Sequence, residues 1–252
     1  MRLGAFLLAI LALLPFTTPA EAQTPPSCAA GTLYLTIDTG WGREAERIAE
    51  ILRRRGVRAT LFVAQEPTHN GTRSLDPAWG PFWRARAAEG HVFASHTDRH
   101  WYFRSDPAPG RVRYVSRARE GEAALDQPAM CAELARPIER LRDAVPDATV
   151  LPLWRAPGGI VTPNALRMGA ACGLRHQGWT ANGFLGDELD SAAHPNRALR
   201  DRALRTIRDG EVLVMHWGVR GRREPYAEVL DEVIAGLHAR GFCFAPLPPQ
   251  GR

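Results

Sequence analysis

The chain has 252 residues, of which 45% are hydrophobic and 23% are charged, and its formal net charge at pH 7 is +5. This length and apolar content suit a single α/β domain with a large core. All 32 basic residues are arginine, which excludes a Schiff-base lysine and a P-loop nucleotide site. The arginines are spread along the chain and form no basic arm with interleaved aromatics, which argues against a nucleic-acid partner.

The N-terminal segment has the pattern of a secretory signal. Met1-Arg2 gives a positive start, residues 3–16 are mostly apolar, and Ala20-Glu21-Ala22 matches a cleavage site. A proline breaks the apolar run, which is shorter than the roughly 20 residues of a membrane span. We therefore expect a signal peptide over 1–22 and a periplasmic or secreted domain over 23–252 with no membrane anchor. An uncleaved anchor is the alternative.

Apolar strand-like runs alternate with amphipathic helical runs from about residue 32 onward. The expected strands are 33–37, 58–64, 91–95, 150–154, 174–179, 211–215 and 242–246. The expected helices are 43–55, 77–88, 112–144, one that begins at 163, 196–208 and 225–240. Strands joined by helical crossovers predict a parallel sheet with both faces covered.

Polar and aromatic side chains follow most of these strands: Asp38, Thr39, His96, His100, Arg155, Trp179, Asn182 and His216. In parallel α/β folds, chemistry collects at the carboxyl ends of the strands. His96 and His100 also have the i, i+4 spacing that lets two imidazoles reach one metal ion. Such a pair also arises by chance, so its significance depends on the other residues at this edge.

The motifs resemble, in order, those of the polysaccharide deacetylase family, the carbohydrate esterases with a NodB homology domain. The family's Thr-Phe-Asp-Asp-Gly is similar to residues 36–40, and its His-Ser/Thr-x-x-His to residues 96–100. Its Arg-x-Pro is matched at 155–157, and its strand ending in Leu-x-His resembles 213–216. The resemblance covers roughly 33–247 and implies an α/β fold, a distorted or incomplete (β/α) barrel with a mostly parallel, NodB-like sheet.

The resemblance also implies a divalent metal, zinc first, held by His96, His100 and the residue at position 39. In the family that residue is an aspartate, and here it is Thr39. A hydroxyl is a poorer ligand than a carboxylate, so we expect a weakened site. The alternative is that Asp38 moves onto the metal. Similar substitutions occur in muramic-acid-type deacetylases, which look like functional members.

Three catalytic roles follow from the same resemblance. Asp38 is expected to be the general base, and Arg155 to hold it in place and keep it ionised. His216 is expected to protonate the leaving group. Each role has a simpler rival: Asp38 as a turn residue, Arg155 as a structural ion-pair partner, and His216 as a buried core histidine.

The family's aspartate-rich fourth motif is degraded in this chain. After Trp179, the sequence has Asn182 and only later Asp187 and Asp190. Trp179 and Asn182 are candidates for substrate binding, with core packing an equal alternative for the tryptophan. The two aspartates either orient Arg155 or His216, or simply begin a solvated loop.

The four cysteines all lie in the predicted mature domain. An oxidising compartment allows two disulfides in three connectivities, with four buried free thiols as the alternative. Cys131 and Cys172 fall in helices that flank one strand, whereas Cys28 precedes the first strand and Cys243 lies in the last. Because a closing barrel brings its ends together, we expect the pairs 131–172 and 28–243.

The sequence thus favours a secreted, metal-assisted deacetylase that acts on an acetylated polysaccharide or peptidoglycan sugar. The positive net charge suits anionic polymers such as cell-wall glycans. A non-catalytic glycan-binding member with a degraded metal site is the main alternative, favoured by Thr39. An amidohydrolase of small cyclic amides is a third possibility, which the signal peptide disfavours. Oligomeric state, the particular glycan, and N- versus O-deacetylation stay open.

Overall fold

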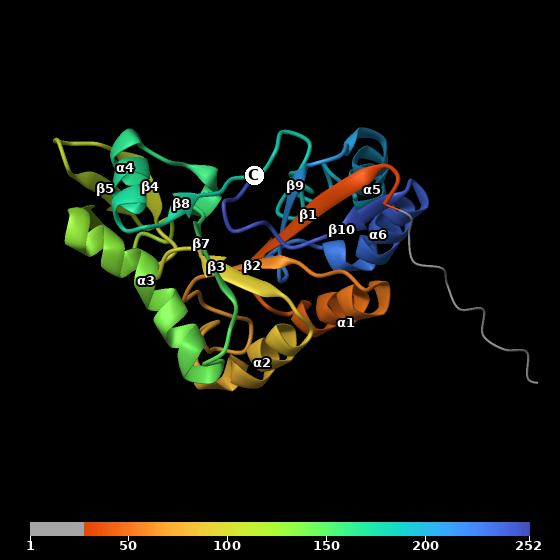
Figure 1. The fold of residues 1–252 in the computed structure, drawn as a ribbon, viewed down its shortest axis with the longest axis horizontal. Helices are drawn as coiled ribbons and strands as arrows, with labels where there is room; N and C mark the ends of the chain where they lie inside the picture. The colour runs from red at the N-terminus through yellow and green to blue at the C-terminus, as the bar shows by residue number, and fades with distance from the viewer. Residues whose placement is uncertain (1–27) are drawn as a thin grey trace, which may run out of the picture.

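The computed structural model describes residues 28–252, so the predicted signal peptide lies outside the described residues. Among the residues described, no helix has both the length and the apolar character needed to cross a membrane. The fold is built around a curved parallel sheet with helices packed along its outside (Figure 1).

The sheet has seven strands in the order β10-β1-β2-β3-β7-β8, and β9 pairs with β1 as well. Their bounds are β1 (Gly31–Asp38), β2 (Thr60–Val63), β3 (Val92–Ser95), β7 (Val150–Trp154), β8 (Arg175–His176), β9 (Val212–His216) and β10 (Phe242–Phe244). Every pairing among them is parallel. This open half-barrel confirms the predicted α/β fold class.

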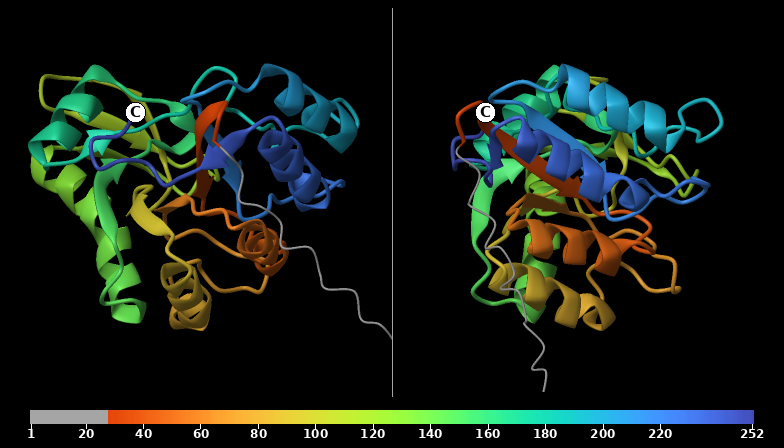
Figure 2. Two further views of the ribbon diagram at one scale, coloured as in Figure 1. Left: turned by 45° about the vertical axis from the view of Figure 1, so that its right-hand side comes forward. Right: turned by 90° about the vertical axis from the view of Figure 1, so that its right-hand side faces the viewer.

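Six helices accompany the sheet: α1 (Ala45–Arg55), α2 (Gly80–Ala88), α3 (Gln127–Ala144), α4 (Pro163–Ala171), α5 (Asn196–Thr206) and α6 (Leu230–Ala239). Figure 2 shows α2, α1 and α6 stacked along one side of the sheet. Helix α6 buries Leu230, Val233, Ile234 and Leu237, the spacing of one helical face. Helix α4 begins where predicted, because the Thr162 hydroxyl accepts the Ala165 amide.

One predicted element was wrong. Residues 112–126 do not begin a long helix; they form β5 (Val112–Val115) and β6 (Glu122–Leu125), which join β4 (Tyr102–Ser105) in an antiparallel sheet. Val112 and Tyr114 point into the core with no exposed surface. Arg113 points outward and pairs with a glutamate of β6 at 2.6 Å. This is an alternation of period two, which the arginine-rich composition concealed.

The register of the sheet aligns the strand ends that carry the predicted site. Asp38 is level with His216 on β9 and with Phe62 on β2. Ser95, one residue before the first histidine, is level with Trp154 at the end of β7. The residues that follow these strands therefore share one edge of the sheet.

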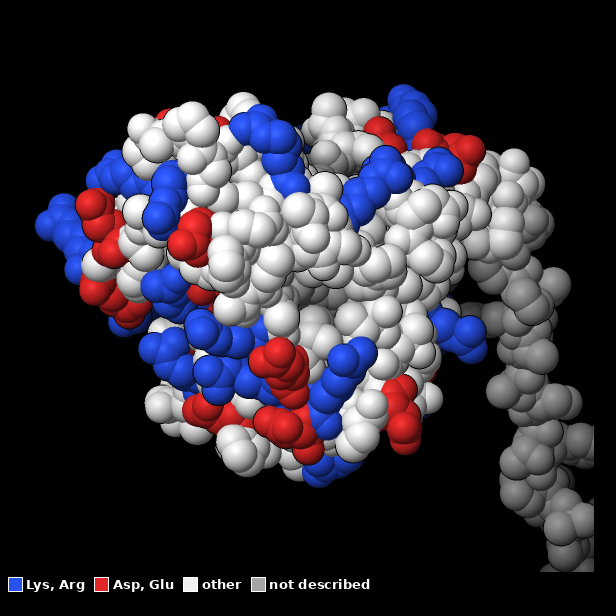
Figure 3. All heavy atoms as spheres, turned by 60° about the vertical axis from the view of Figure 1, so that its left-hand side comes forward, with Lys and Arg blue, Asp and Glu red and all other residues white. Residues whose placement is uncertain are grey.

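Charged side chains are mixed over the surface. On the face drawn in Figure 3, arginines gather in the left and lower parts with acidic residues beside them, and much of the rest of the face is uncharged. Exposed ion pairs such as Arg113–Glu122 and Arg111–Asp126 account for several of the arginines. Such exposed pairs contribute little stability.

Both disulfides form as predicted. Cys28 is bonded to Cys243, which ties the start of β1 to β10, and Cys131 of α3 is bonded to Cys172 at the end of α4. No cysteine among the described residues is free. One bond thus links two neighbouring strands near the termini of the domain, and the other links two neighbouring helices.

We expect replacement of both Cys131 and Cys172 by serine to lower the free energy of unfolding by about 2 to 4 kcal/mol, since the bond closes a long loop in the unfolded chain. Denaturant unfolding without reductant measures this loss, and the wild type in reductant serves as the comparison. An unchanged midpoint would contradict a stabilising role for this bond.

Candidate active site

A cleft of about 710 Å³ opens at the carboxyl ends of the parallel strands. Predicted site residues among those that line it are Asp38, Thr39, His96, His100, Trp179 and His216. Arg155 lies behind this lining and is fully buried. The cleft therefore assembles residues that are far apart in the sequence, from the ends of β1, β3 and β9 and the loops after β2 and β8.

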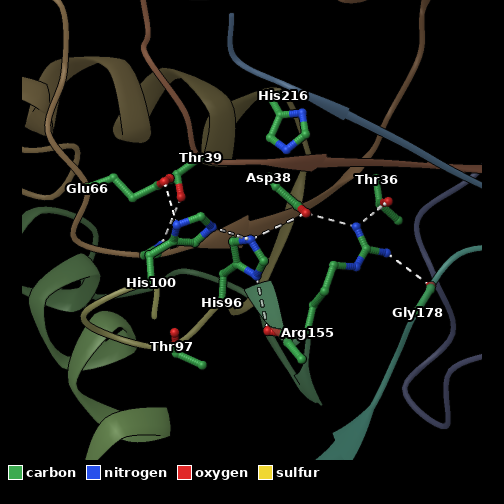
Figure 4. A network of polar contacts seen from close by, with 12 residues as sticks. Thr36, Asp38, Thr39, Glu66, His96, Thr97, His100, Arg155, Gly178 and His216 are labelled. Carbon is green, nitrogen blue, oxygen red and sulfur yellow. Dashed lines mark hydrogen bonds and ion pairs between the residues drawn. The ribbon is translucent and has the colours of Figure 1, made fainter. Parts of the chain in front are cut away.

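A buried ion pair between Asp38 and Arg155 lies at the base of the cleft. Arg155 Nη1 donates to Asp38 Oδ1 at 2.8 Å and to the Thr36 hydroxyl at 2.7 Å (Figure 4). Its Nε and Nη2 donate to the carbonyls of Gln177 and Gly178 at 3.0 and 3.1 Å. With its donors fixed from several sides, the guanidinium has one position.

This pairing holds the Asp38 carboxyl ionised. Burial alone would raise its pKa, but the positive charge of Arg155 and the nearby His96 and His216 lower the pKa below the ordinary value near 3.8. The Oδ1 atom bonds the guanidinium, while Oδ2 lies 3.4 Å from His96 Nε2. One oxygen is thus anchored, and the other faces the histidines.

His96 and His100 turn the same ring nitrogen toward each other. Their Nε2 atoms are 3.1 Å apart. His96 Nδ1 lies 3.0 Å from the Arg155 carbonyl, and His100 Nδ1 lies 2.9 Å from Glu66 Oε1. Both partners are acceptors, so each Nδ1 carries the proton. Two Nε2 lone pairs that face each other repel unless a proton or a metal cation lies between them.

Burial lowers the pKa of His96 to about 4, with Asp38 opposing the shift, so this imidazole is neutral near pH 7. A neutral imidazole whose Nδ1–H is engaged presents its Nε2 lone pair as a ligand. The ring is 1% exposed, which keeps it in that orientation.

The loop that carries both histidines is held by a buried polar cluster. Thr97 and His100 have positive φ angles of 66° and 55°, a conformation that side chains rarely adopt. Glu133 of α3, 1% exposed, accepts the Arg99 amide at 2.7 Å and the Tyr114 hydroxyl at 3.0 Å. Tyr114 Oη also lies 2.9 Å from Thr97 Oγ1. The small sheet and α3 together therefore fix the backbone of this loop.

His216 is paired with Asp187 on the opposite side of Asp38 from the two other histidines (Figure 4). Its Nδ1 lies 3.1 Å from Asp187 Oδ2, and its backbone amide donates to the same oxygen at 2.7 Å. Burial would lower its pKa, yet Asp187, with help from Asp38 and Glu188, raises it to about 10. His216 is therefore an imidazolium at neutral pH.

The backbone around His216 approaches β1 closely because position 40 is glycine. A Cβ atom on Gly40 would lie 2.7 Å from the Gly218 carbonyl oxygen and 3.2 Å from the His216 Cβ. The Trp41 amide also donates to that carbonyl at 2.9 Å. Any side chain at position 40 would push the His216 loop away from Asp38.

Aromatic side chains form part of the cleft wall. Trp41, Tyr102 and Trp179 line it, and the Trp179 ring centroid lies 5.6 Å from the Arg155 guanidinium. Asn182 is not among the lining residues; its amide nitrogen donates to Glu211 at 2.8 Å. The structure thus places Trp179 at the site and Asn182 away from it.

Residues 27–176 match the family model described as polysaccharide deacetylase. The chain belongs to the polysaccharide deacetylase family. The match includes Asp38, His96, His100 and Arg155, whereas His216 and its partner aspartate lie beyond it. These last two are assigned to the site by geometry alone: His216 lines the cleft, and Asp187 lies 3.1 Å from its Nδ1.

Three solved structures share the fold of this polysaccharide deacetylase. A family 4 carbohydrate esterase from Streptomyces lividans, in complex with acetate, has a TM-score of 0.62 and 20% identity over 87% of this chain and 94% of that one. A family 4 acetyl xylan esterase from Clostridium thermocellum with a cobalt ion has a TM-score of 0.64 and 17% identity over 85% and 87%. A pseudoenzyme of the same family from Bacillus anthracis has a TM-score of 0.63 and 17% identity over 86% and 64%.

The donor set of this family member fits a divalent metal only in part. Within residues 28–252, no cluster of three or more His, Cys, Asp or Glu side chains is arranged as it stands to hold a metal ion. His96 and His100 offer two converging nitrogens, and Asp38 Oδ2 lies within 3.4 Å of the first. The Thr39 hydroxyl accepts the Ala64 amide at 3.2 Å, so one of its lone pairs is already used. Two imidazoles with oxygen donors nearby suit zinc.

Two residues that contact the histidines or their loop were not predicted from the sequence. Glu66 follows β2, and its carboxylate contacts His100; an acidic residue directly after a central strand was the available signal. Glu133 lies in the middle of α3 with an apolar surround, and no spacing in the sequence links it to the histidine loop. Of the two partners that the sequence allows for Asp187, Arg155 and His216, the structure pairs it with His216.

We expect Asp187→Asn to lower the His216 pKa from about 10 to its ordinary value near 6.5 or below. The reason is that the neutral amide removes the attraction while burial still disfavours the charged ring. NMR titration of the imidazole measures the change. Asp190→Asn is the matched control, because Asp190 only accepts two amides of its own turn. An Asp187→Asn titration that matches the wild type would contradict the assignment.

Proposed function

We propose that this protein removes acetyl groups from an acetylated polysaccharide or peptidoglycan sugar by metal-assisted hydrolysis. One observation carries the proposal: an ionised carboxylate, Asp38, and a protonated imidazole, His216, face one cleft and are held in opposite protonation states. Such a pair can take a proton at one atom and give a proton at another.

Asp38 Oδ2 takes the proton of the attacking water, because Oδ1 is occupied by Arg155. Arg155 keeps the carboxylate ionised and fixed. A divalent metal, zinc first, bound by His96 and His100 would acidify that water and polarise the acetyl carbonyl. His216 donates its proton to the departing amine or alkoxide, and Asp187 stabilises the imidazolium before transfer.

The shape of the cleft supports a sugar substrate. The rings of Trp41, Tyr102 and Trp179 on its wall provide apolar surfaces that can pack against sugar faces. A volume of about 710 Å³ suits a glycan segment better than a small cyclic amide. The two disulfides support a periplasmic or secreted location, as the N-terminal sequence pattern does.

A non-catalytic glycan-binding role is the second candidate. It is favoured by Thr39, which stands where the family has a metal-binding aspartate and whose hydroxyl already accepts an amide. The family fold also includes a pseudoenzyme among the solved structures. Under this alternative the cleft binds glycan, and nothing is hydrolysed.

Acetate release by the purified mature protein decides between the two candidates. We expect release from at least one of peptidoglycan, chitin oligomers and acetylated xylan, lost with a chelator and restored by added zinc. Glycan binding in a pull-down assay without acetate release would support the binding role and reject hydrolysis. Release that survives full metal removal would reject the metal-assisted reaction.

Asp38→Asn and His216→Ala are each expected to reduce acetate release at least about 100-fold, because general acid and general base steps contribute that much or more. Thermal unfolding should stay cooperative in both. The controls are Asp190→Asn and His194→Ala, which change the same residue types away from the cleft. Near wild-type release by either cleft variant would reject the assigned roles.

A further inference from the structure

Glu66 places a carboxylate beside the position where the first motif lacks one. Its Oε1 lies 2.9 Å from His100 Nδ1 (Figure 4). The Thr39 side chain lies beside the same carboxylate and helps to lower the pKa of Glu66. Because the Thr39 oxygen accepts the Ala64 amide, its hydroxyl proton is free to face Glu66. A carboxylate that is missing at position 39 is thus present at position 66, where it contacts His100 and not His96.

The backbone N–H and the backbone C=O of Glu66 are both hydrogen-bonded to Ser74. Its amide donates to the Ser74 hydroxyl at 3.0 Å, and its carbonyl accepts the Ser74 amide at 2.9 Å. Ser74 is itself 3% exposed. The side chain of Glu66 is only 14% exposed. Because the backbone and most of the side chain of Glu66 are already held in place, little conformational entropy is lost when its carboxylate contacts His100.

The second carboxylate oxygen of Glu66 is buried, which distinguishes this contact from an ion pair on the surface. Glu66 Oε2 is buried and has no hydrogen-bond partner of normal geometry among the described residues. A buried carboxylate oxygen without a partner is costly unless the charge is used elsewhere. The only imidazole that Glu66 contacts among those residues is the one whose Nε2 faces His96.

We propose that Glu66 is the carboxylate of the metal site: by accepting the Nδ1 proton of His100 it turns Nε2 toward His96, and its charge takes the place of the aspartate absent at position 39. The inference rests on the proposed metal-assisted function. Glu66 acts through His100 and is therefore a positioning residue. Such outer carboxylates raise the basicity of a histidine ligand and fix its orientation.

The test is zinc affinity, measured by calorimetry or by competition with a chromophoric chelator, in the metal-free full mature protein. We expect Glu66→Gln and Glu66→Ala to weaken zinc binding about 10- to 100-fold. Glu122→Gln removes the same charge from an exposed ion pair outside the cleft lining, and its zinc affinity should stay within about twofold of wild type. Equal affinity of wild type and both Glu66 variants would overturn the inference.

A second substitution tests the replacement of one carboxylate by another. Thr39→Asp should strengthen zinc binding, and the gain should be larger in the Glu66→Gln background than in the wild type. Equal gains in the two backgrounds would mean that the carboxylates act independently, which contradicts the inference. If Glu66→Gln and Glu66→Ala fail to fold, Glu66→Asp withdraws the carboxylate from Nδ1 while keeping its charge, and zinc binding should still weaken.

The experiment separates the two proposals. Wild-type protein that binds no zinc would reject metal-assisted hydrolysis and the role of Glu66 together. Wild-type protein that binds zinc with the same affinity as the Glu66 variants would reject only the role of Glu66. Nitrogen NMR of metal-free protein adds a readout independent of activity: the His100 Nδ1–H tautomer should be lost in Glu66→Ala.

Discussion

The buried ion pair between Asp38 and Arg155 is the interaction on which the rest of the site depends. It joins the ends of β1 and β7, two strands separated in the sheet by β2 and β3. Taking both charges out of water costs several kcal/mol per ion, and the cost is repaid only if the remaining donors are satisfied. Here Thr36 and the carbonyls of Gln177 and Gly178 satisfy them. The ion pair therefore keeps an ionised carboxylate at the base of the cleft.

Two histidines near that carboxylate show how position sets chemistry. Burial holds the pKa of His96 near 4, because the nearby Asp38 carboxylate offsets only part of the cost of charging a ring removed from water. The pKa of His216 is near 10, because its Nδ1 faces the charged Asp187. One ring is thereby neutral near pH 7, and the other is positively charged. The difference lies in their partners and not in the histidines themselves.

The family provides a frame in which the departures of this chain can be interpreted. Loss of the aspartate at position 39 removes a metal ligand but leaves Asp38, Arg155 and His216 in their mutual arrangement. The proposed hydrolysis rests on this retained arrangement of a buried charge pair beside a histidine paired with Asp187. Glu66 offers a route by which a carboxylate can still serve the same histidines.

Much of the fold and of the site followed from local sequence. Apolar runs of four or five residues marked the strands, and the polar residues after them marked the cleft, because parallel strands must end at one edge. The placement of Cys28 before the first strand and of Cys243 in the last also sufficed for their pairing. These inferences needed only spacing and strand direction.

Other features were decided by tertiary structure. Residues 112–125 form strands because Val112 and Tyr114 find a buried surface against Phe103 and α3, which no local pattern records. The partners of His100, His216 and the histidine loop are Glu66, Asp187 and Glu133, each distant in sequence from the group it contacts. The sequence by itself determined most of the chemical groups that reach the cleft, because they directly follow the strands. Packing brought Glu66 to the cleft and decided which charges face each other, because pKa values and ligand orientation depend on distances of about 3 Å that only the folded chain sets.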